Sequence, residues 1–403
     1  MRNLLYVAAV TATFFTSCSS DDDINEIEEN EIIIPANYTF ERDGQSTVDY
    51  NGQTTRLQMA AELNAAFTDF DNSSEQLLLD MFSNTNNAFS NEELNASDKS
   101  IKSKIASSNL YFSTNTVESN EIKADFEGFI SEQMTTVLQN KEEVAEAGVA
   151  GQIASGSSVR YVNEKGLELN QAFAKGLIGG LLADQILNNY LSTAVLDEGD
   201  NRSNNDDTIT EDGQVYTTME HKWDEAYGYL VGDPSIPGND PFSMLNQSND
   251  RLLFSYLGQV DADEDFAGIA AETLEAFKVG RAAIVAGDYE LRDEQVAIIR
   301  ENLSTVIAVR AVHYLMGGKT SLAEGEFGSA FHELSEGYGF IYSLRFTNNP
   351  DNDMPYLETE SINAIKSALL AGNGFWDVTP ETLDSSAQEI ASEFGFTVAE
   401  AAE

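Results

Sequence analysis

The chain has 403 residues, 42% of them hydrophobic, which is enough for one large or two medium globular domains. Its formal net charge of −46 argues against binding to nucleic acid, because a phosphate backbone is met by Lys and Arg, and against docking on anionic lipid by charge alone. We therefore expect no nucleic-acid partner. The charge is interpreted first as a solvated, self-repelling surface that keeps the protein soluble.

The first residues have the pattern of a secreted protein. Arg2 precedes an apolar run that ends at Phe15 and is too short to cross a bilayer as a mature helix. Small residues then lead to Cys18, the only cysteine, which excludes an intrachain disulfide or a cysteine-based zinc site. This arrangement resembles a bacterial lipoprotein signal, and the resemblance implies a signal peptide at 1–17 and lipid attached to Cys18. Ordinary secretion with an incidental cysteine is the alternative.

Residues 18–34 are dense in Asp and Glu and are predicted to form a flexible acidic tether. An acidic run beside a lipidated cysteine resembles the surface-export signal of Bacteroidota lipoproteins. The resemblance implies an outer membrane lipoprotein exposed on the outside of the cell, with a periplasm-facing anchor as the alternative. No later apolar stretch is long enough to span a membrane, so we expect the lipid to be the membrane attachment.

The folded part is expected to begin at Pro35 and to be mainly α-helical. Residues 38–55 alternate aromatic or β-branched residues with polar ones and contain two turn-forming pairs, which predicts one small N-terminal β-hairpin. Segment 163–191 is rich in Gly and Ala and is predicted to be a central, buried helix. The spacing of apolar residues predicts helices at 54–67, 73–82, 119–139, 163–191, 267–287, 293–318, 357–374 and 379–394.

Two polar stretches interrupt the helical pattern. Residues 196–214 are dense in Asp and Asn, but their spacing does not match an EF-hand, so an exposed loop is favoured over a calcium site. Residues 232–242 hold several of the few prolines and are predicted to mark the join between two halves. We therefore predict a first helical subdomain with the hairpin at 35–240 and a second helical subdomain at 241–403.

Two of the three histidines head the same pattern, His-x-x-x-Glu-x-Tyr-Gly-aromatic. Residues 221–229 read HKWDEAYGY and residues 332–340 read HELSEGYGF. From composition, a random histidine would carry Glu, Tyr and Gly at these offsets less often than about once in a thousand, so the pattern predicts an internal duplication. The helix before each copy also ends in Tyr-Leu, at Tyr190 and Tyr314.

On a helix, the offsets 0, +4 and +7 share one stripe, so each copy aligns a histidine, a glutamate and a glycine. The glycine permits close approach of a neighbouring backbone, which predicts that the stripe packs against another helix. A tyrosine at offset +6 flanks the stripe and completes a candidate ligand-binding set. The residues are His221, Glu225, Tyr227 and Gly228 in the first copy, and His332, Glu336, Tyr338 and Gly339 in the second.

Three uses of these pairs are open at this point. The first is structural, with the glutamate holding the histidine within a helix contact. The second is metal binding, in which two copies around a pseudo-twofold axis supply four ligands, His221, Glu225, His332 and Glu336. The third is catalytic, with the glutamate as a base and a polarised histidine. No catalytic residue is assigned, and a metal ion is the only cofactor considered.

The opening PANYTFERDG, the stretch HKWDEAYGYL and the later HELSEGYGFIYSLRF resemble an uncharacterised domain family of Bacteroidota lipoproteins over nearly the whole mature chain. A more distant resemblance is to imelysin-like proteins. These are envelope proteins of two related helical bundles with a Gly-x-His-x-x-Glu motif, linked to iron or haem uptake and once classed as peptidases. This chain lacks that glycine and has its glutamate at offset +4, so only His221 with Asp224 follows the spacing in part.

These resemblances imply a duplicated helical bundle in a membrane-tethered envelope lipoprotein. The expected role is a binding protein, with iron, haem or another small ligand taken up. One alternative is a metal-dependent hydrolase or peptidase, which needs an open coordination position and a water-activating glutamate. The other is a structural or interaction protein of the cell envelope.

Overall fold

The computed structural model describes residues 32–245 and 251–402. The predicted signal peptide at 1–17, the lipidated Cys18 and the tether up to residue 31 lie outside the described residues. From Ile32 onward the chain makes one compact unit, which is described here by itself. The predicted division at residues 240–241 into two subdomains stays a prediction.

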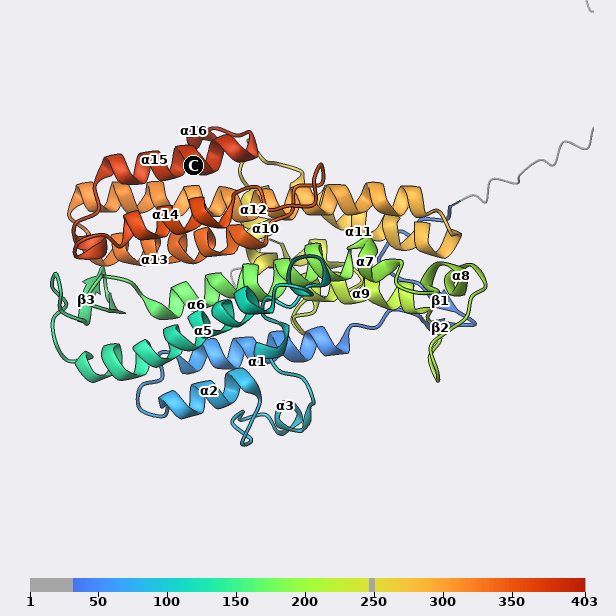
Figure 1. Cartoon of the computed structure of the whole chain (residues 1–403), viewed down its shortest axis with the longest axis horizontal. Coiled ribbons are helices and arrows are strands. Elements are labelled where there is room, and N and C mark those ends of the chain that lie inside the picture. Colours follow the sequence, from blue (N-terminus) through green and yellow to red (C-terminus); the bar gives the residue numbers. More distant parts are fainter. Residues whose placement is uncertain (1–31, 246–250, 403) are drawn as a thin grey trace, which may run out of the picture. The chain divides into compact units, whose positions relative to one another are not determined.

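The fold is mainly α, as the periodicity indicates: 62% of the described residues are helical, and these residues also form two small two-stranded antiparallel sheets (Figure 1). The helices among the described residues are α1 (Asn51–Ala66), α2 (Glu75–Ser83), α3 (Glu92–Ala96), α4 (Asn109–Phe112), α5 (Thr116–Glu132), α6 (Leu169–Leu177), α7 (Thr193–Leu196), α8 (Asn201–Asp206), α9 (Thr218–Val231), α10 (Leu253–Asp261), α11 (Ile269–Ala286), α12 (Tyr289–Glu324), α13 (Phe327–Ser343), α14 (Thr359–Leu369), α15 (Pro380–Phe394) and α16 (Val398–Ala401).

The predicted N-terminal hairpin is present but short. Strands β1 (Glu41–Arg42) and β2 (Gln45–Ser46) pair antiparallel around the expected turn, in which Asp43 and Gly44 have positive φ. The second predicted turn, at 51–52, is wrong because α1 already begins there.

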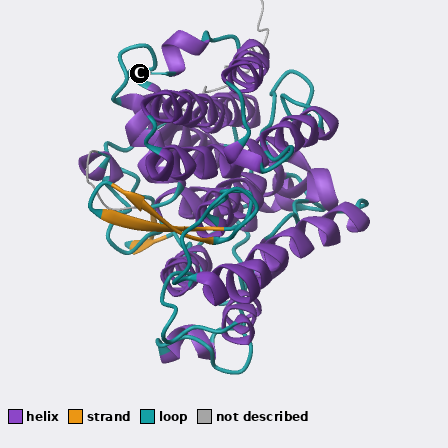
Figure 2. Ribbon diagram, turned by 90° about the vertical axis from the view of Figure 1, so that its left-hand side faces the viewer, coloured by secondary structure: helices purple, strands orange, loops and turns teal. Residues whose placement is uncertain are grey.

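A second hairpin, β3 (Gly151–Ser155) with β4 (Ser158–Val162), was not predicted. Figure 2 shows its orange strands beside purple helices. The hairpin packs on α13, where a Cβ built on Gly328 would lie 2.0 Å from the backbone oxygen of Ala154. The alternation of residues 158–162 and the Gly156 turn were the available signal.

The segment predicted as the central helix is central and buried, but it is not a regular α-helix. Helix α6 continues into two π-helical segments, Ile178–Ala183 and Ile186–Tyr190, and residues 172–188 are all buried. Its small residues permit close packing: a Cβ on Gly179 would lie 2.5 Å from the Cα of Ser343 on α13. π-Helical turns are uncommon and are frequent at functional positions.

Helix α13 packs along α6, whereas α9 packs against the other end of this segment, at Ile186–Tyr190. The longest helix, α12, packs against α11, α13 and α15 (Figure 1). No helix of the described residues is long and apolar enough to cross a bilayer. The two motif-bearing helices are thus both held by one buried segment, 169–190.

Candidate functional site

Helix α9 carries the first copy of the repeated motif, and its start is fixed by a capping box. The backbone N–H of Glu220 donates to the Thr217 hydroxyl at 3.3 Å, and the backbone N–H of Thr217 donates to the Glu220 carboxylate at 2.7 Å. Two otherwise unpaired backbone donors are satisfied in this way. The cap therefore places the Glu220 carboxylate at the buried end of the helix, beside α11.

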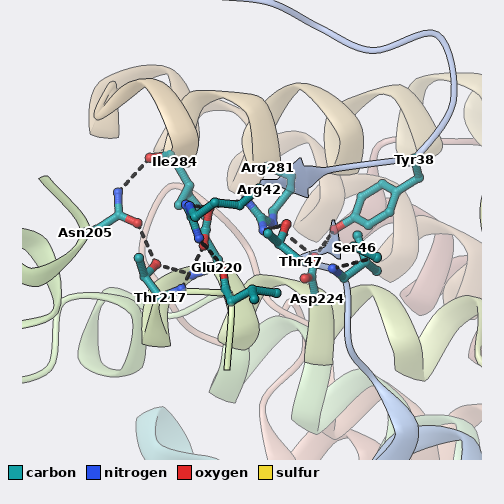
Figure 3. A network of polar contacts seen from close by, with 12 residues as sticks. Tyr38, Arg42, Ser46, Thr47, Asn205, Thr217, Glu220, Asp224, Arg281 and Ile284 are labelled. Atoms are coloured by element: carbon teal, nitrogen blue, oxygen red, sulfur yellow. Dashed lines mark hydrogen bonds and ion pairs between the residues drawn. The ribbon is translucent and has the colours of Figure 1, made fainter. Parts of the chain in front are cut away.

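One face of α9 holds a buried guanidinium. Arg281, on α11, donates from Nη1 to Glu220 and from Nε to Asp224, each at 3.1 Å. Its Nη2 donates to the hydroxyl of Thr47 at 3.0 Å. The side chains of Arg281, Glu220 and Asp224 are at most 1% exposed, so the two carboxylates supply the pairing that a buried charge requires (Figure 3).

The same face fastens the N-terminal segment to the helical body. The Tyr38 hydroxyl donates to Asp224 at 2.7 Å, and its ring stacks on Tyr227 with centroids 3.7 Å apart. Arg42 donates to both Glu220 oxygens, at 2.9 and 3.0 Å. Figure 3 shows Tyr38 and Arg42 of the N-terminal segment, Glu220 and Asp224 of α9, and Arg281 of α11 converging. The first copy of the motif therefore provides the surface of α9 against which the segment around β1 and β2 packs.

Electrostatics in this network follow from burial and from Arg281. Burial raises the pKa of Asp224 to about 6, against the opposing effect of Arg281 and the Tyr38 hydrogen bond. Burial also opposes ionisation of Glu220, but Arg281 and Arg42 outweigh it and leave the Glu220 pKa below its ordinary value. Burial, with Asp224 nearby, raises the pKa of Tyr38 well above its ordinary value, so the phenol stays a hydrogen-bond donor.

The predicted glycine contact of the first copy is made with a tyrosine side chain. A Cβ built on Gly228 would lie 2.3 Å from the Cβ of Tyr50, the residue that precedes α1. Tyr50 also meets Tyr227 edge-on, with centroids 6.1 Å apart. Gly228 therefore makes room for the same N-terminal segment that Tyr227 stacks against.

The remaining polar residues of the first copy lie on another face of α9. Glu225 accepts from Lys222 at 2.8 Å and from Gln53, on α1, at 3.0 Å. His221 makes no ion pair with Glu225 among the described residues; its ring stacks on Tyr216 with centroids 4.6 Å apart. The Nδ1 atom of His221 is buried and has no hydrogen-bond partner. The expected pairing of His221 with Glu225 is thus replaced by separate contacts.

Helix α13 carries the second copy, and here the histidine does have carboxylate partners. His332 Nδ1 lies 3.2 Å from Glu168, and its Nε2 lies 4.0 Å from Glu336. Glu336 in turn pairs with Lys175 at 3.2 Å. The Ser335 hydroxyl accepts from the backbone N–H of Glu168 at 2.8 Å. Glu168 immediately precedes α6 and Lys175 lies in its last turn, whereas Glu336 lies on α13 itself, one turn after His332.

The predicted helix contact of Gly339 is made with α6. A Cβ on Gly339 would lie 2.5 Å from the Cβ of Lys175 and 3.1 Å from the backbone oxygen of Ala172. Tyr338 points elsewhere: its ring meets the Lys366 ammonium, with 5.7 Å between nitrogen and centroid. Burial raises the pKa of Tyr338 above its ordinary range.

The structure does not bring the two histidines to one site. His332 contacts Glu168, at the start of segment 169–190, whereas α9 stacks Tyr229 on Tyr190, at its end. The two motif copies therefore contact opposite ends of this segment. Within residues 32–245 and 251–402, no group of three or more His, Cys, Asp or Glu is placed to hold a metal ion. A ligand role for either copy alone stays a prediction.

Sequence reasoning missed Arg281, Tyr38 and Glu168. The signal for Arg281 was present, since a cation in the otherwise uncharged stretch 279–286 needs buried acids as partners. Nothing in the sequence indicates which acids these are, because the pairing depends on how α11 packs against α9.

Comparison with known proteins gives one match. A family model described as "Domain of unknown function (DUF4856)" matches residues 35–397. No curated protein and no solved structure matches the chain.

Proposed function

The chain belongs to the family described as domain of unknown function DUF4856, and we propose that it is a lipid-anchored binding protein of the cell envelope. Cys18 carries the lipid, the acidic residues up to 34 form the tether, and the helical body is presented outside the outer membrane. The signal-like pattern of residues 1–18 and the acidic run after it support this role.

One observation carries the proposal: the first folded segment after the tether is fastened to the body by buried polar contacts. Tyr38, Arg42 and Thr47 bond to Asp224, Glu220 and Arg281, which lie on two separate helices. A domain that is anchored through its N-terminus needs a stably ordered N-terminal segment. The ends of most domains are poorly ordered unless specific contacts hold them in place. The fastening supports tethering through the N-terminus.

The duplication is part of the proposal. In the first copy Tyr190 stacks on Tyr229, with centroids 6.1 Å apart and planes at 29°. In the second copy Tyr314 stacks on Phe340, with centroids 5.7 Å apart and planes at 20°. Each pair joins the tyrosine of a Tyr-Leu dipeptide to the aromatic residue at offset +8 of the motif. The same contact in both copies supports descent of two helix pairs from one unit, as in the imelysin-like arrangement.

We include no metal in the proposed role. A haem or iron site needs several converging ligands, and among the described residues neither motif copy gathers three. The His332 nitrogens face Glu168 on one side and Glu336 on the other, so these two acids do not converge on one ion.

The test is lipid labelling and fractionation of the full chain in its native host. The wild type is expected to incorporate labelled fatty acid, to sediment with the outer membrane and to be cut by protease added to intact cells. Cys18→Ser is expected to lose the label and the membrane association. A labelled Cys18→Ser variant would overturn the proposal, and a wild type protected in intact cells would overturn its surface location.

A further inference from the structure

The first motif copy holds an excess of positive charge around one tyrosine. Two ammonium groups lie against the Tyr190 ring: Lys104 Nζ is 5.2 Å and Lys222 Nζ 5.6 Å from its centroid. Lys104 also donates to the Tyr190 hydroxyl at 3.1 Å. Arg56, on α1, is 6% exposed and donates to backbone oxygens in its own region. Three cations therefore gather here, in a chain with 22 Lys and Arg and a net charge of −46.

Few acids balance these cations. Glu225 pairs with Lys222, and no carboxylate among the described residues forms an ion pair with Lys104 or Arg56. The next acid is Asp184, whose Oδ2 accepts the backbone N–H groups of Ser107 and of Ser108, at 2.9 and 3.0 Å.

Desolvation and the neighbouring Arg56 lower the pKa of Lys104, which is what an incompletely paired ammonium undergoes.

Two polar atoms beside the cluster lack partners. The Tyr229 hydroxyl is fully buried and has no hydrogen-bond partner, and it lies within electrostatic reach of Arg56 and Glu225. The Nδ1 atom of His221 is likewise buried and unpartnered, next to Glu225. Buried polar groups in folded proteins are almost always satisfied, so two such atoms beside an excess of cations point to an absent partner.

The second motif copy offers the contrast. There, Lys175 and His332 each lie beside a carboxylate, Glu336 and Glu168, although two arginines, Arg160 and Arg310, are also close. Phe340 replaces Tyr229 at offset +8, so the unpartnered hydroxyl is missing as well. The first copy therefore differs from the second in holding a lysine, Lys104, that forms no ion pair among the described residues, whereas Lys175 pairs with Glu336.

We propose that the first motif copy binds a small oxyanion, a phosphate or carboxylate group, between Lys104 and Lys222 beside Tyr190, with Glu225 as the internal group that competes for Lys222. This deepens the proposed binding function by giving it a site and a ligand class. Oxyanions with several acceptor oxygens are the usual partners of clustered lysine and arginine donors. The half-buried Lys104, Lys222 and Glu225 reach solvent and give the anion access.

The test is isothermal titration of the full chain in detergent with inorganic phosphate, sulfate and acetate, at constant ionic strength set with chloride. The wild type is expected to bind phosphate saturably at one site. Lys104→Met is expected to weaken binding at least about tenfold, which corresponds to about 1.4 kcal/mol, because it removes a charge-assisted hydrogen-bond donor. The matched control is Lys319→Met, which removes an exposed lysine paired with Asp384 and is expected to bind as the wild type does.

A second variant separates binding from stability. Glu225→Gln removes the competing carboxylate, so it is expected to tighten phosphate binding about three- to tenfold, whereas a purely structural Glu225 leaves anion affinity unchanged. A wild type that binds none of the three anions, or a Lys104→Met variant with wild-type affinity, overturns the inference. Because the titration does not depend on lipid or location, its failure is distinct from failure of the Cys18 experiment.

Discussion

Helices α9 and α13 carry the same nine-residue pattern and use it differently. At offset +8 both stack an aromatic ring on the tyrosine of a Tyr-Leu dipeptide. At offsets −1 and +3 they differ: Glu220 and Asp224 bind Arg281, whereas Phe331 and Ser335 occupy these places in α13. The residues common to both copies determine how each helix packs. The residues that differ between the copies determine which distant segment each helix binds.

Among substitutions that compare the two motif copies, we expect the largest difference in unfolding free energy at offset +3. Asp224→Ala leaves the Tyr38 hydroxyl without its acceptor and removes one of two carboxylates from the buried Arg281, so we expect a loss of about 3–5 kcal/mol in the free energy of unfolding. Ser335→Ala removes one hydrogen bond to the Glu168 backbone and should cost about 1–2 kcal/mol. Urea unfolding of both variants measures the difference, and equal losses would remove the distinction between the copies.

Asp184, in the segment that holds both copies, makes stability depend on pH. Burial raises its pKa from 3.8 to about 6. The folded state therefore holds this proton more tightly than the unfolded state, and stability falls as pH rises from about 4 to 6, by up to about 3 kcal/mol.

Asp184→Asn keeps an oxygen for the two backbone donors and removes this titration. The difference in unfolding free energy between pH 4 and pH 7 is then expected to shrink by up to about 3 kcal/mol, while Asp212→Asn, in an exposed loop, leaves it unchanged. An Asp184→Asn variant with the wild-type pH profile would show that the carboxyl does not titrate in this range.

The two motif glycines test how firmly each copy is packed. Gly339→Ala places a Cβ against α6, including the Ala172 backbone, and is expected to cost about 2–3 kcal/mol. Gly228→Ala places its Cβ nearest to the Tyr50 side chain of the N-terminal segment and should cost about 1–2 kcal/mol.

The matched control is Gly128→Ala, in the exposed face of α5. A Cβ there meets nothing within 4 Å, so helix propensity alone predicts a gain of about 0.5–1 kcal/mol. Thermal unfolding ranks the three variants, and a larger loss for Gly228→Ala than for Gly339→Ala would reverse the comparison.

We expect the smallest difference in stability between the two copies when the motif glutamates are substituted. Glu336→Gln leaves the buried Lys175 with a neutral partner and should cost about 1–2 kcal/mol, whereas Glu225→Gln at the half-buried Lys222 should cost less than about 1 kcal/mol. Chemical denaturation in low and high salt checks this, because screening should reduce only the effect at Glu225.

The sequence predicts the secondary structure of this protein better than it predicts the tertiary contacts. Periodicity correctly predicts a mainly helical fold and the buried segment 163–191, because apolar spacing is a local property. It does not predict the π-helical turns at Ile178–Ala183 and Ile186–Tyr190. In the structure Gly339 packs against α6, but the partners of His332 and Asp224 depend on tertiary packing and could not be derived from the sequence.

The most direct test of the account is hydrogen exchange at the amides of Tyr38 and Thr47, which donate to the backbone oxygens of Asn239 and Phe40 at 3.1 and 2.8 Å. If the first motif copy fastens the N-terminal segment, Asp224→Ala removes the protection of both amides while Ser335→Ala retains it. Protection that survives in Asp224→Ala, or is lost equally in both variants, would contradict the claim that α9 holds the segment around β1 and β2 on the helical body.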